Sequence, residues 1–350
     1  MDKFENQKKT SPVTIKDIAA MAGVSVGTVS RVINDKEYVA PATKKRILKC
    51  IKETGYNPSV AARSLNKSPT NLIGVVVPEI SNPFLSELFV SIEHILSKKG
   101  YALLLCNTEH HKSKFKQFIN DLAQWNAYGF LIISVEPDAQ DIAKLQEQGM
   151  NAVTIFVKTN VFDYVCVTES QGMFDITEHL ISKGHDRIAY VGLSSELSTM
   201  GERFDGYKTA MEKHGLALNK KHMAIHEGRA DEGFDSTQKS YEATRTMLGA
   251  ADPPTAFIYA NDHYAINGYM AIAESGLQVG KDIAVAGFDN IPISKLLMPP
   301  LSTVAYDTIT MAELASDMVI RKKSGAGGSA TNPKRVLLPT TLIVRQSTES

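Results

Sequence analysis

Short apolar runs alternate with amphipathic stretches from residue 72 to residue 288. Runs that are apolar at nearly every position are typical of strands in a parallel sheet whose two faces are covered by helices. The runs are more numerous than one sheet holds comfortably, so the pattern predicts two doubly wound α/β subdomains. The nine runs lie at 72–77, 101–106, 129–134, 152–157, 163–167, 187–192, 222–227, 255–260 and 282–288.

The beginning of the chain has a different character. Residues 14–56 show only helical patterns, and we expect the polar residues 1–12 to form a flexible tail. The first 70 residues hold 13 Lys and Arg against 6 Asp and Glu, whereas the remainder holds 25 against 32, although the whole chain has no net charge. A basic end on an acidic body predicts that the first segment binds a polyanion and that the remainder does not.

Residues 14–34 predict two short helices joined by a tight turn. Thr14 and Asp17 have the spacing of a capping box, Gly23 suits the turn, and Ser25 is a good N-cap for the second helix. A third helix is expected from Pro41 to Thr54, ending at Gly55. We expect that helix to direct Ile47, Leu48 and Ile51 inward and to carry its basic residues outward.

The second helix opens on the small residues 25–28, which allow a backbone to approach another surface closely. A helix N-terminus attracts phosphate, while hydroxyl and guanidinium groups bind phosphate oxygens and base edges. The three helices therefore predict a helix-turn-helix domain whose second helix enters the major groove. The alternative is a generic three-helix bundle with a solvated lysine face.

The ordered segments "VTIKDIAAMAGVSVGTVSRVIN", "VAPATKKRILKCIKETGYNPSVAARSL", "IGVVVPEISNPFLSEL", "HLISKGHDRIAYVG", "RFDGYKTAM", "IAVAGFDN" and "LIVRQST" resemble the lactose/galactose-repressor (LacI/GalR) family of bacterial transcription regulators. The resemblance spans nearly the whole chain from Val13. It implies a helix-turn-helix headpiece, a hinge helix and a core similar to periplasmic binding proteins, with two copies acting as a homodimer on a pseudo-palindromic operator in double-stranded DNA.

This resemblance sets the expected domains. We expect the tail at 1–12, the DNA-binding domain at 13–57, the hinge helix at 58–68 and the effector-binding and dimerisation core at 69–350. Within the core, one subdomain is expected at about 69–165 and 298–328, and the other at about 166–297 and 329–350. The patch at 324–330 is expected to be a loop before a final strand pair.

The resemblance also implies which residues contact DNA. Val26, Gly27 and Arg31 take base-reading positions, and several hydroxyl and amide side chains face phosphates. The hinge is too short to be a stable helix alone in water, so we expect it to become helical on DNA, where Leu65 wedges into the minor groove. The expected DNA-binding residues are Thr14, Ser25, Val26, Gly27, Thr28, Ser30, Arg31, Asn34, Ala62 and Leu65.

A small effector is expected beyond the carboxyl ends of the core strands, as in other open parallel sheets. An aromatic ring facing Arg, amide and carboxylate groups can clamp vicinal hydroxyls, so a sugar or sugar derivative is the leading class. Arg229 stands where relatives often carry an aromatic residue, and with Arg203 it can instead favour a sugar phosphate. The expected effector-binding residues are Phe84, Leu85, Arg203, Arg229, Asn261 and Asp289.

Other chemistry finds little support in the sequence. No nucleophile–base pair or phosphate-binding glycine loop stands out, so we expect neither an enzyme nor a cofactor. Cys106, His110 and His111 are a weak metal-site candidate, and we expect no metal. The scattered cysteines predict free thiols, and the chain has neither a secretory signal nor a membrane span, so we expect a cytoplasmic protein without membrane contact.

Four functions are therefore compared. The leading one is a DNA-binding regulator, most often a repressor, that is controlled by an effector. A second keeps that DNA role but uses a phosphoprotein as co-regulator. A solute-binding receptor shares the core fold but requires export, and a sugar-processing enzyme lacks a catalytic constellation.

Overall fold

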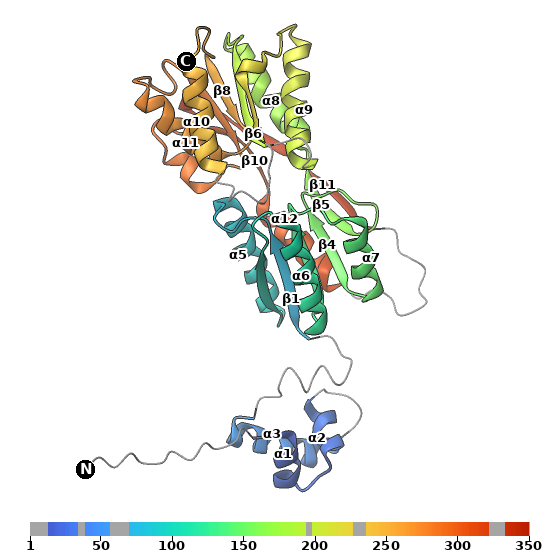
Figure 1. Cartoon of the computed structure of the whole chain (residues 1–350). Coiled ribbons are helices and arrows are strands. Elements are labelled where there is room, and N and C mark those ends of the chain that lie inside the picture. Colours follow the sequence, from blue (N-terminus) through green and yellow to red (C-terminus); the bar gives the residue numbers. More distant parts are fainter. Residues whose placement is uncertain are drawn as a thin grey trace, which may run out of the picture. The chain divides into compact units, whose positions relative to one another are not determined.

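The computed structural model describes residues 13–33, 39–56, 70–193, 198–226, 236–321 and 333–349. These residues form two compact units, Met1–Thr70 and Asn71–Ser350 (Figure 1). The expected tail (1–12) and hinge helix (58–68) lie outside the described residues, so both stay predictions.

The described residues of the first unit form three helices: α1 (Ile15–Ala22), α2 (Val26–Ile33) and α3 (Pro41–Thr54). Thr14 and Asp17 form the predicted capping box, and Gly23 ends α1 with a φ of 62°, in the left-handed region that glycine tolerates. The inward faces of the helices bury a small apolar core, which consists of Ile18, Ala19, Ala22, Val29, Val32, Ile47 and Cys50.

One core position of α3 differs from the prediction. The side chain of Leu48 is 48% exposed, whereas Cys50 is buried. Cys50 follows Ile47 by three residues and therefore lies on the same helix face, while Leu48 is rotated away from it by about 100°. The prediction that Leu48 packs inward is wrong.

The first sheet of the second unit has six parallel strands in the order β11-β5-β4-β3-β1-β2. Helices α5 and α12 bury their apolar sides on one face, and α6 and α7 cover the other. This sheet and its helices are called the first lobe. Its elements are β1 (Leu72–Val77), α5 (Pro83–Lys98), β2 (Ala102–Asn107), α6 (Lys112–Gln124), β3 (Gly129–Ile133), α7 (Ala139–Glu147), β4 (Asn151–Ile155), β5 (Asp163–Val167), α12 (Thr308–Ile320) and β11 (Arg335–Leu338).

The second sheet has the order β12-β10-β9-β8-β6-β7 and is parallel except for β12, which runs antiparallel to β10. Figure 1 shows it between the pair α8 and α9 and the pair α10 and α11; together they are called the second lobe. The two lobes confirm the predicted α/β class with two doubly wound sheets. Its elements are α8 (Glu169–Ser182), β6 (Ile188–Leu193), α9 (Ser198–Lys213), β7 (Met223–His226), α10 (Ser236–Leu248), β8 (Ala256–Tyr259), α11 (Asp262–Glu274), β9 (Ala284–Phe288), β10 (Ser302–Tyr306) and β12 (Thr340–Ile343).

Two strands lie in the opposite lobes from those predicted. β10 was expected in the subdomain that contains 298–328, but it pairs with β9 in the second lobe. β11 was expected in the subdomain that contains 329–350, but it pairs with β5 in the first lobe. The predicted final strand pair is also wrong, because β11 and β12 belong to different sheets. An apolar run shows that a strand exists but not which sheet it joins, and here the chain changes lobes after β5, β10 and β11.

The described ranges contain no helix that is both long enough and apolar enough to cross a bilayer. The three cysteines are free, as predicted, and all three are buried. Burial raises the pKa of the Cys106 and Cys166 thiols to about 12, which keeps them protonated and unreactive at neutral pH.

Candidate functional site

The front turn of α2 is held by a contact between two hydroxyl side chains. Thr28 donates its backbone N–H to Ser25 Oγ at 3.2 Å, and the two hydroxyl oxygens lie 2.9 Å apart. Ser25 is therefore placed as an N-cap. The partial positive charge of the helix N-terminus is thus presented by an ordered turn, and its hydroxyls can also bind a phosphate oxygen.

Gly27 in this turn is not required by packing. A Cβ built at this position lies 3.7 Å from Ser25 Oγ and meets nothing closer in the described structure. Glycine inside a helix costs about 1 kcal/mol relative to alanine, so the fold alone favours a larger residue here. Val26 beside it is 40% exposed. The two residues form a small exposed tip, which suits close approach to a groove of duplex DNA.

The other expected DNA-binding residues differ from one another in their exposure and in their contacts. Arg31 is exposed in the last turn of α2, and Ser30 is partly buried. The Thr14 hydroxyl donates to Asp17 Oδ2 at 2.7 Å, and hydrogen bonds from Thr14, first from its backbone N–H, lower the pKa of Asp17. Thr14 therefore acts as a helix cap in the structure. Asn34, Ala62 and Leu65 lie outside the described residues and stay predictions.

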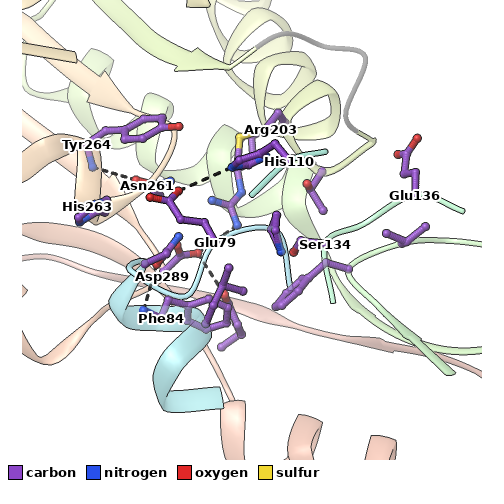
Figure 2. Close-up of a pocket in the computed structure, with 18 residues that line it drawn as sticks. Glu79, Phe84, His110, Ser134, Glu136, Arg203, Asn261, His263, Tyr264 and Asp289 are labelled. Carbon is purple, nitrogen blue, oxygen red and sulfur yellow. Dashed lines mark hydrogen bonds and ion pairs between the residues drawn. The ribbon is translucent and has the colours of Figure 1, made fainter. Parts of the chain in front are cut away.

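A cavity lies between the strand ends of the two lobes of the second unit (Figure 2). In the first lobe its lining residues follow the carboxyl ends of β1 to β4, and in the second they follow β6, β8 and β9 or end β10. This is the position that open parallel sheets offer to ligands. The structure brings together five of the six expected effector-binding residues, namely Phe84, Leu85, Arg203, Asn261 and Asp289. Arg229 lies outside the described residues.

Aromatic rings form one wall of the cavity. Phe84 stands at the start of α5, where its N–H donates to the Asn82 side chain at 3.0 Å. Its ring contacts Phe156 and Tyr306 edge to face, with centroids 5.5 and 5.6 Å apart. Phe156 and Tyr306 also pack on each other at 5.7 Å. Each ring fixes the other two, so the wall offers a preformed apolar surface to a ligand.

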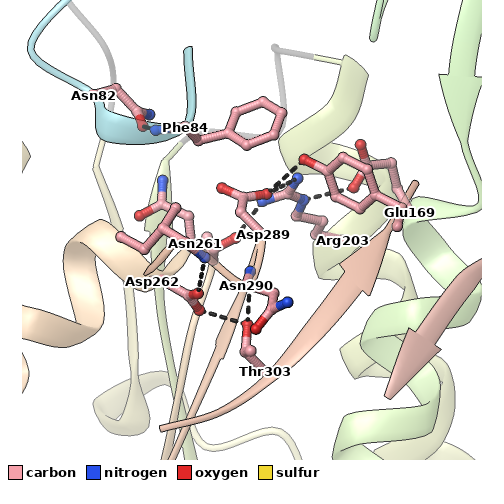
Figure 3. Close-up of polar contacts among 12 residues, drawn as sticks. Asn82, Phe84, Glu169, Arg203, Asn261, Asp262, Asp289, Asn290 and Thr303 are labelled. Carbon is pink, nitrogen blue, oxygen red and sulfur yellow. Dashed lines mark hydrogen bonds and ion pairs between the residues drawn. The ribbon is translucent and has the colours of Figure 1, made fainter. Parts of the chain in front are cut away.

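Arg203 is the polar centre of the cavity (Figure 3). It is only 4% exposed, and its Nε donates to Glu169 Oε2 at 2.6 Å. Its two Nη atoms donate to the Ala260 carbonyl at 2.6 Å and to Asp289 Oδ1 at 3.0 Å. The guanidinium carbon also lies 3.8 Å from the centre of the Phe288 ring. The guanidinium is therefore held in place by several groups of the second lobe.

Burial has the largest effect on the pKa values of the two carboxyl groups in this cluster. It raises the pKa of Glu169 to about 7, although the Arg203 charge acts in the opposite direction. Burial likewise raises the pKa of Asp289, again against the effect of Arg203. For Arg203 the two carboxylates prevail over burial, and its pKa lies above the ordinary value. The guanidinium is therefore always charged.

Asn261 and Asp262 begin α11 and serve different purposes. The Asn261 side chain accepts the Tyr264 N–H at 2.8 Å, which caps the helix at the cavity wall. Asp262 is fully buried and points the other way, toward the segment after β9 (Figure 3). Its carboxylate accepts hydrogen bonds from the Ile291 N–H and the Ser294 hydroxyl. The segment that carries Asp289 is thereby tied to α11.

Several cavity residues were missed by sequence reasoning. Glu79 follows β1, its Oε2 lies 3.7 Å from His110 Nε2, and the interaction with His110 lowers the pKa of Glu79. Ser134, Glu136 and His263 also line the cavity. The signal that could have found them is their position, since each residue lies shortly after a strand.

The histidines considered from the sequence have other surroundings than a metal site. His110 lines the cavity, and His185 Nδ1 is hydrogen-bonded to Thr255 Oγ1 at 3.0 Å. The described residues include no group of three or more His, Cys, Asp or Glu side chains that could hold a metal ion.

Two family models match the chain. Residues 14–59 match the model of bacterial regulatory proteins of the lacI family, and residues 177–348 match a periplasmic binding protein-like domain. The first match covers the three helices of the first unit. The second covers most of the second lobe and the end of the chain.

Similar proteins extend these matches over the whole length. The chain is 31% identical over 347 residues to the HTH-type transcriptional repressor PurR of Haemophilus influenzae (strain PittEE), and the alignment covers 96% of this chain and 99% of the relative. The structure of a lac repressor dimer bound to operator and the anti-inducer ONPF is 26% identical, with a TM-score of 0.78 and coverage of 97% and 100%. A complex of the transcriptional regulator CelR with cellobiose is 27% identical, with a TM-score of 0.66 and coverage of 96% and 99%.

Proposed function

Because the chain belongs to the lacI family of bacterial regulatory proteins, we propose that it is a sequence-specific DNA-binding transcriptional repressor whose operator affinity is controlled by a small effector. The first unit binds the operator and the cavity of the second unit binds the effector. A repressor acts where the operator DNA is, so we place the protein in the cytoplasm.

The observation that carries the DNA-binding function is the front turn of α2. It joins a capped helix N-terminus, two hydroxyl side chains and the exposed tip of Val26 and Gly27 on a segment that matches the lacI family model. Phosphate contacts from such a turn position a helix in the major groove, and the neighbouring exposed side chains then read base edges. The basic first 70 residues add a favourable electrostatic term.

The effector is a sugar or a similar polyhydroxylated molecule. The aromatic wall around Phe84 can stack on an apolar sugar face, while Arg203, Asn261 and Asp289 offer polar groups opposite it. The structural relative CelR is a complex with cellobiose, which supports this class. An effector bound between the two lobes changes their preferred angle, and operator affinity changes with it.

The acting species is a homodimer on a pseudo-palindromic operator, as in the lac repressor dimer that resembles this chain. In this proposal, residues 58–68 of the two copies form hinge helices at the operator centre. Leu65 enters the minor groove there and Ala62 packs beside it. Lobe movement then changes the spacing of the two hinges.

Selection of binding sites from a random pool of duplex DNA tests this function with the full chain. We expect the selected sequences to converge on a pseudo-palindrome. Fluorescence anisotropy should show binding to this site about 10³-fold tighter than to shuffled duplex, with affinity falling steeply as salt increases. A pool that does not converge, with or without sugars present, contradicts the proposed function.

A further inference from the structure

A buried glutamate lies next to the arginine of the effector cavity but does not line the cavity itself. Glu169 is the first residue of α8, is 2% exposed and accepts the Arg203 Nε–H at 2.6 Å. Asp289 occupies the other side of the guanidinium at 3.0 Å. Arg203 is therefore held between two buried carboxylates, and this cluster of three side chains carries a net charge of −1 when all are ionised.

Hydrogen bonding alone does not account for a carboxylate at this position. Only Oε2 of Glu169 bonds to Arg203, whereas Oε1 is buried and has no hydrogen-bond partner among the described residues. A neutral amide oxygen could accept the same Nε–H. A second buried charge with an unused oxygen is costly in a protein interior. The charge of Glu169 therefore needs an explanation other than the placement of Arg203.

The other charged residues around the cavity also indicate that the charge of Glu169 affects ligand binding. Glu79 and Glu136 also line the cavity, in the first lobe. Arg203 is the single arginine or lysine among the described lining residues, and its charge is already balanced by Glu169 and Asp289. A phosphate or carboxylate brought to this guanidinium meets a negative cluster, whereas a hydroxyl group needs only a donor or an acceptor. Among the described residues, three of the five N–H groups of Arg203 have acceptors, which leaves two that can donate to a ligand.

We propose that Glu169 is a specificity-determining residue that neutralises Arg203 and thereby makes the cavity select uncharged polyhydroxylated ligands over their phosphorylated or carboxylated counterparts. This inference rests on the proposed function, because it assigns the ligand class of the same cavity. It opposes the sugar phosphate that the sequence suggests from Arg203 together with Arg229, a residue outside the described ranges. Glu169 acts through Arg203 and need not touch the ligand.

Isothermal titration calorimetry on the full chain tests this with matched probe pairs: D-ribose with D-ribose 5-phosphate, and D-glucose with D-glucose 6-phosphate, plus inorganic phosphate. The titrations are run at about pH 8.5, where Glu169, with a pKa of about 7, is ionised. There E169Q, which keeps the shape and the acceptor oxygen, removes one negative charge near Arg203. We expect the affinity for at least one phosphorylated probe to rise about tenfold or more relative to the wild type. A tenfold change corresponds to about 1.4 kcal/mol, which is within the range of the interaction between two charges a few ångströms apart in a protein. Affinity for its neutral partner should change much less.

The matched control is E178Q, which removes the same charge from the same helix. Glu178 pairs with Lys213 and His214 at the surface, so its substitution should leave the preference between paired probes unchanged. Circular dichroism and thermal unfolding check that each variant folds, and Glu169→Ala serves as a second charge-free variant. The wild type alone also decides: a phosphorylated probe that binds it as tightly as its neutral partner overturns the inference.

The inference is equally overturned if no phosphorylated probe gains affinity when Glu169 loses its charge, or if E178Q shows the same gain. Operator binding, measured by anisotropy on the same preparations, separates this outcome from failure of the proposed function. If the wild type prefers its selected operator but E169Q does not change the ligand preference, only the role of Glu169 is refuted. A wild type without any preference for a DNA site refutes the repressor itself.

Discussion

Oδ1 of Asp262 accepts a hydrogen bond from the Thr303 hydroxyl at 2.6 Å, which joins the first turn of α11 to β10. The other oxygen accepts the Ile291 N–H at 3.0 Å and the Ser294 hydroxyl at 2.6 Å. These bonds lie just beyond Asp289, whose φ of 105° belongs to the left-handed half of backbone space that side chains rarely adopt. Asp262 therefore holds the strained turn that presents Asp289 to the cavity.

Asp262→Ala should destabilise the second unit strongly. The substitution leaves three buried donors without their acceptor, at about 1–3 kcal/mol each. We expect the free energy of unfolding in urea to fall by about 3 kcal/mol or more. Thr303→Ser keeps the donor and is the matched control, with a much smaller loss. A loss below about 1 kcal/mol for Asp262→Ala shows that the turn is held by other contacts.

The same residue predicts a dependence of stability on pH. Burial raises the pKa of Asp262 to about 7 in the folded protein, above the 3.8 of the free side chain. The folded state then binds the proton more tightly, so this contribution to stability is present at low pH and is lost as pH rises from about 4 through about 7. The negative charge of Asp289 adds to this increase in the pKa of Asp262. Burial lowers the pKa of Arg345, and the charge of Asp262 acts against that decrease.

Asp262→Asn removes this titration and is the variant to compare. We expect the stability of the wild type relative to Asp262→Asn to decline by up to about 1.4 kcal/mol per pH unit between pH 5 and 7. Glu169 titrates in the same window in both proteins and cancels in the difference. Urea unfolding at several pH values measures it. A constant difference means that Asp262 is ionised throughout this range.

Phe84→Leu should weaken effector binding without preventing folding. Leucine keeps an apolar group at a buried position, but it loses the edge-to-face contacts with Phe156 and Tyr306 and the flat surface for a sugar ring. We expect affinity for a sugar identified by a thermal-shift screen to fall about tenfold. Operator affinity measured without sugar should be unchanged. Unaltered sugar affinity would place the ligand away from the aromatic wall.

Arg31→Ala should reduce DNA specificity more than general DNA affinity. An arginine that forms two hydrogen bonds to guanine contributes about 1–3 kcal/mol of discrimination against other bases, whereas a phosphate contact strengthens binding to all sequences alike. We expect binding to the selected operator to weaken by about tenfold or more and binding to shuffled duplex to weaken little. Lys49→Ala on the exposed side of α3 is the control, and it should reduce both affinities together. Anisotropy with the two duplexes measures both effects.

Local features were predicted well because their causes lie within a few residues. The capping box of Thr14 and Asp17 and the bounds of α3 follow from side chains next to each other in the chain. The alternation of apolar runs with helices similarly predicts two doubly wound sheets. The strands β10 and β11 were assigned to the wrong lobes because strand pairing depends on contacts between distant segments, which no local pattern contains.

The candidate site was predicted only in part for a similar reason. Phe84, Arg203, Asn261 and Asp289 were expected in the cavity, and the structure brings them together. Glu169 was missed because its importance comes from a contact with Arg203 that is 34 positions away in the sequence. Glu79 and His110 were missed although they follow strands, because a polar residue after a strand is more often simply solvated.

The exchange of strands at the end of the chain has a genetic consequence. β11 and β12 are separated by Pro339 alone, and each is the outermost strand of a different sheet. A nonsense codon or frameshift before Arg335 therefore strips an edge from both lobes at once and also removes Arg345, which donates to the Leu301 carbonyl. Late truncations should thus behave as complete loss-of-function alleles, and neither lobe can be cloned as one uninterrupted stretch of coding sequence.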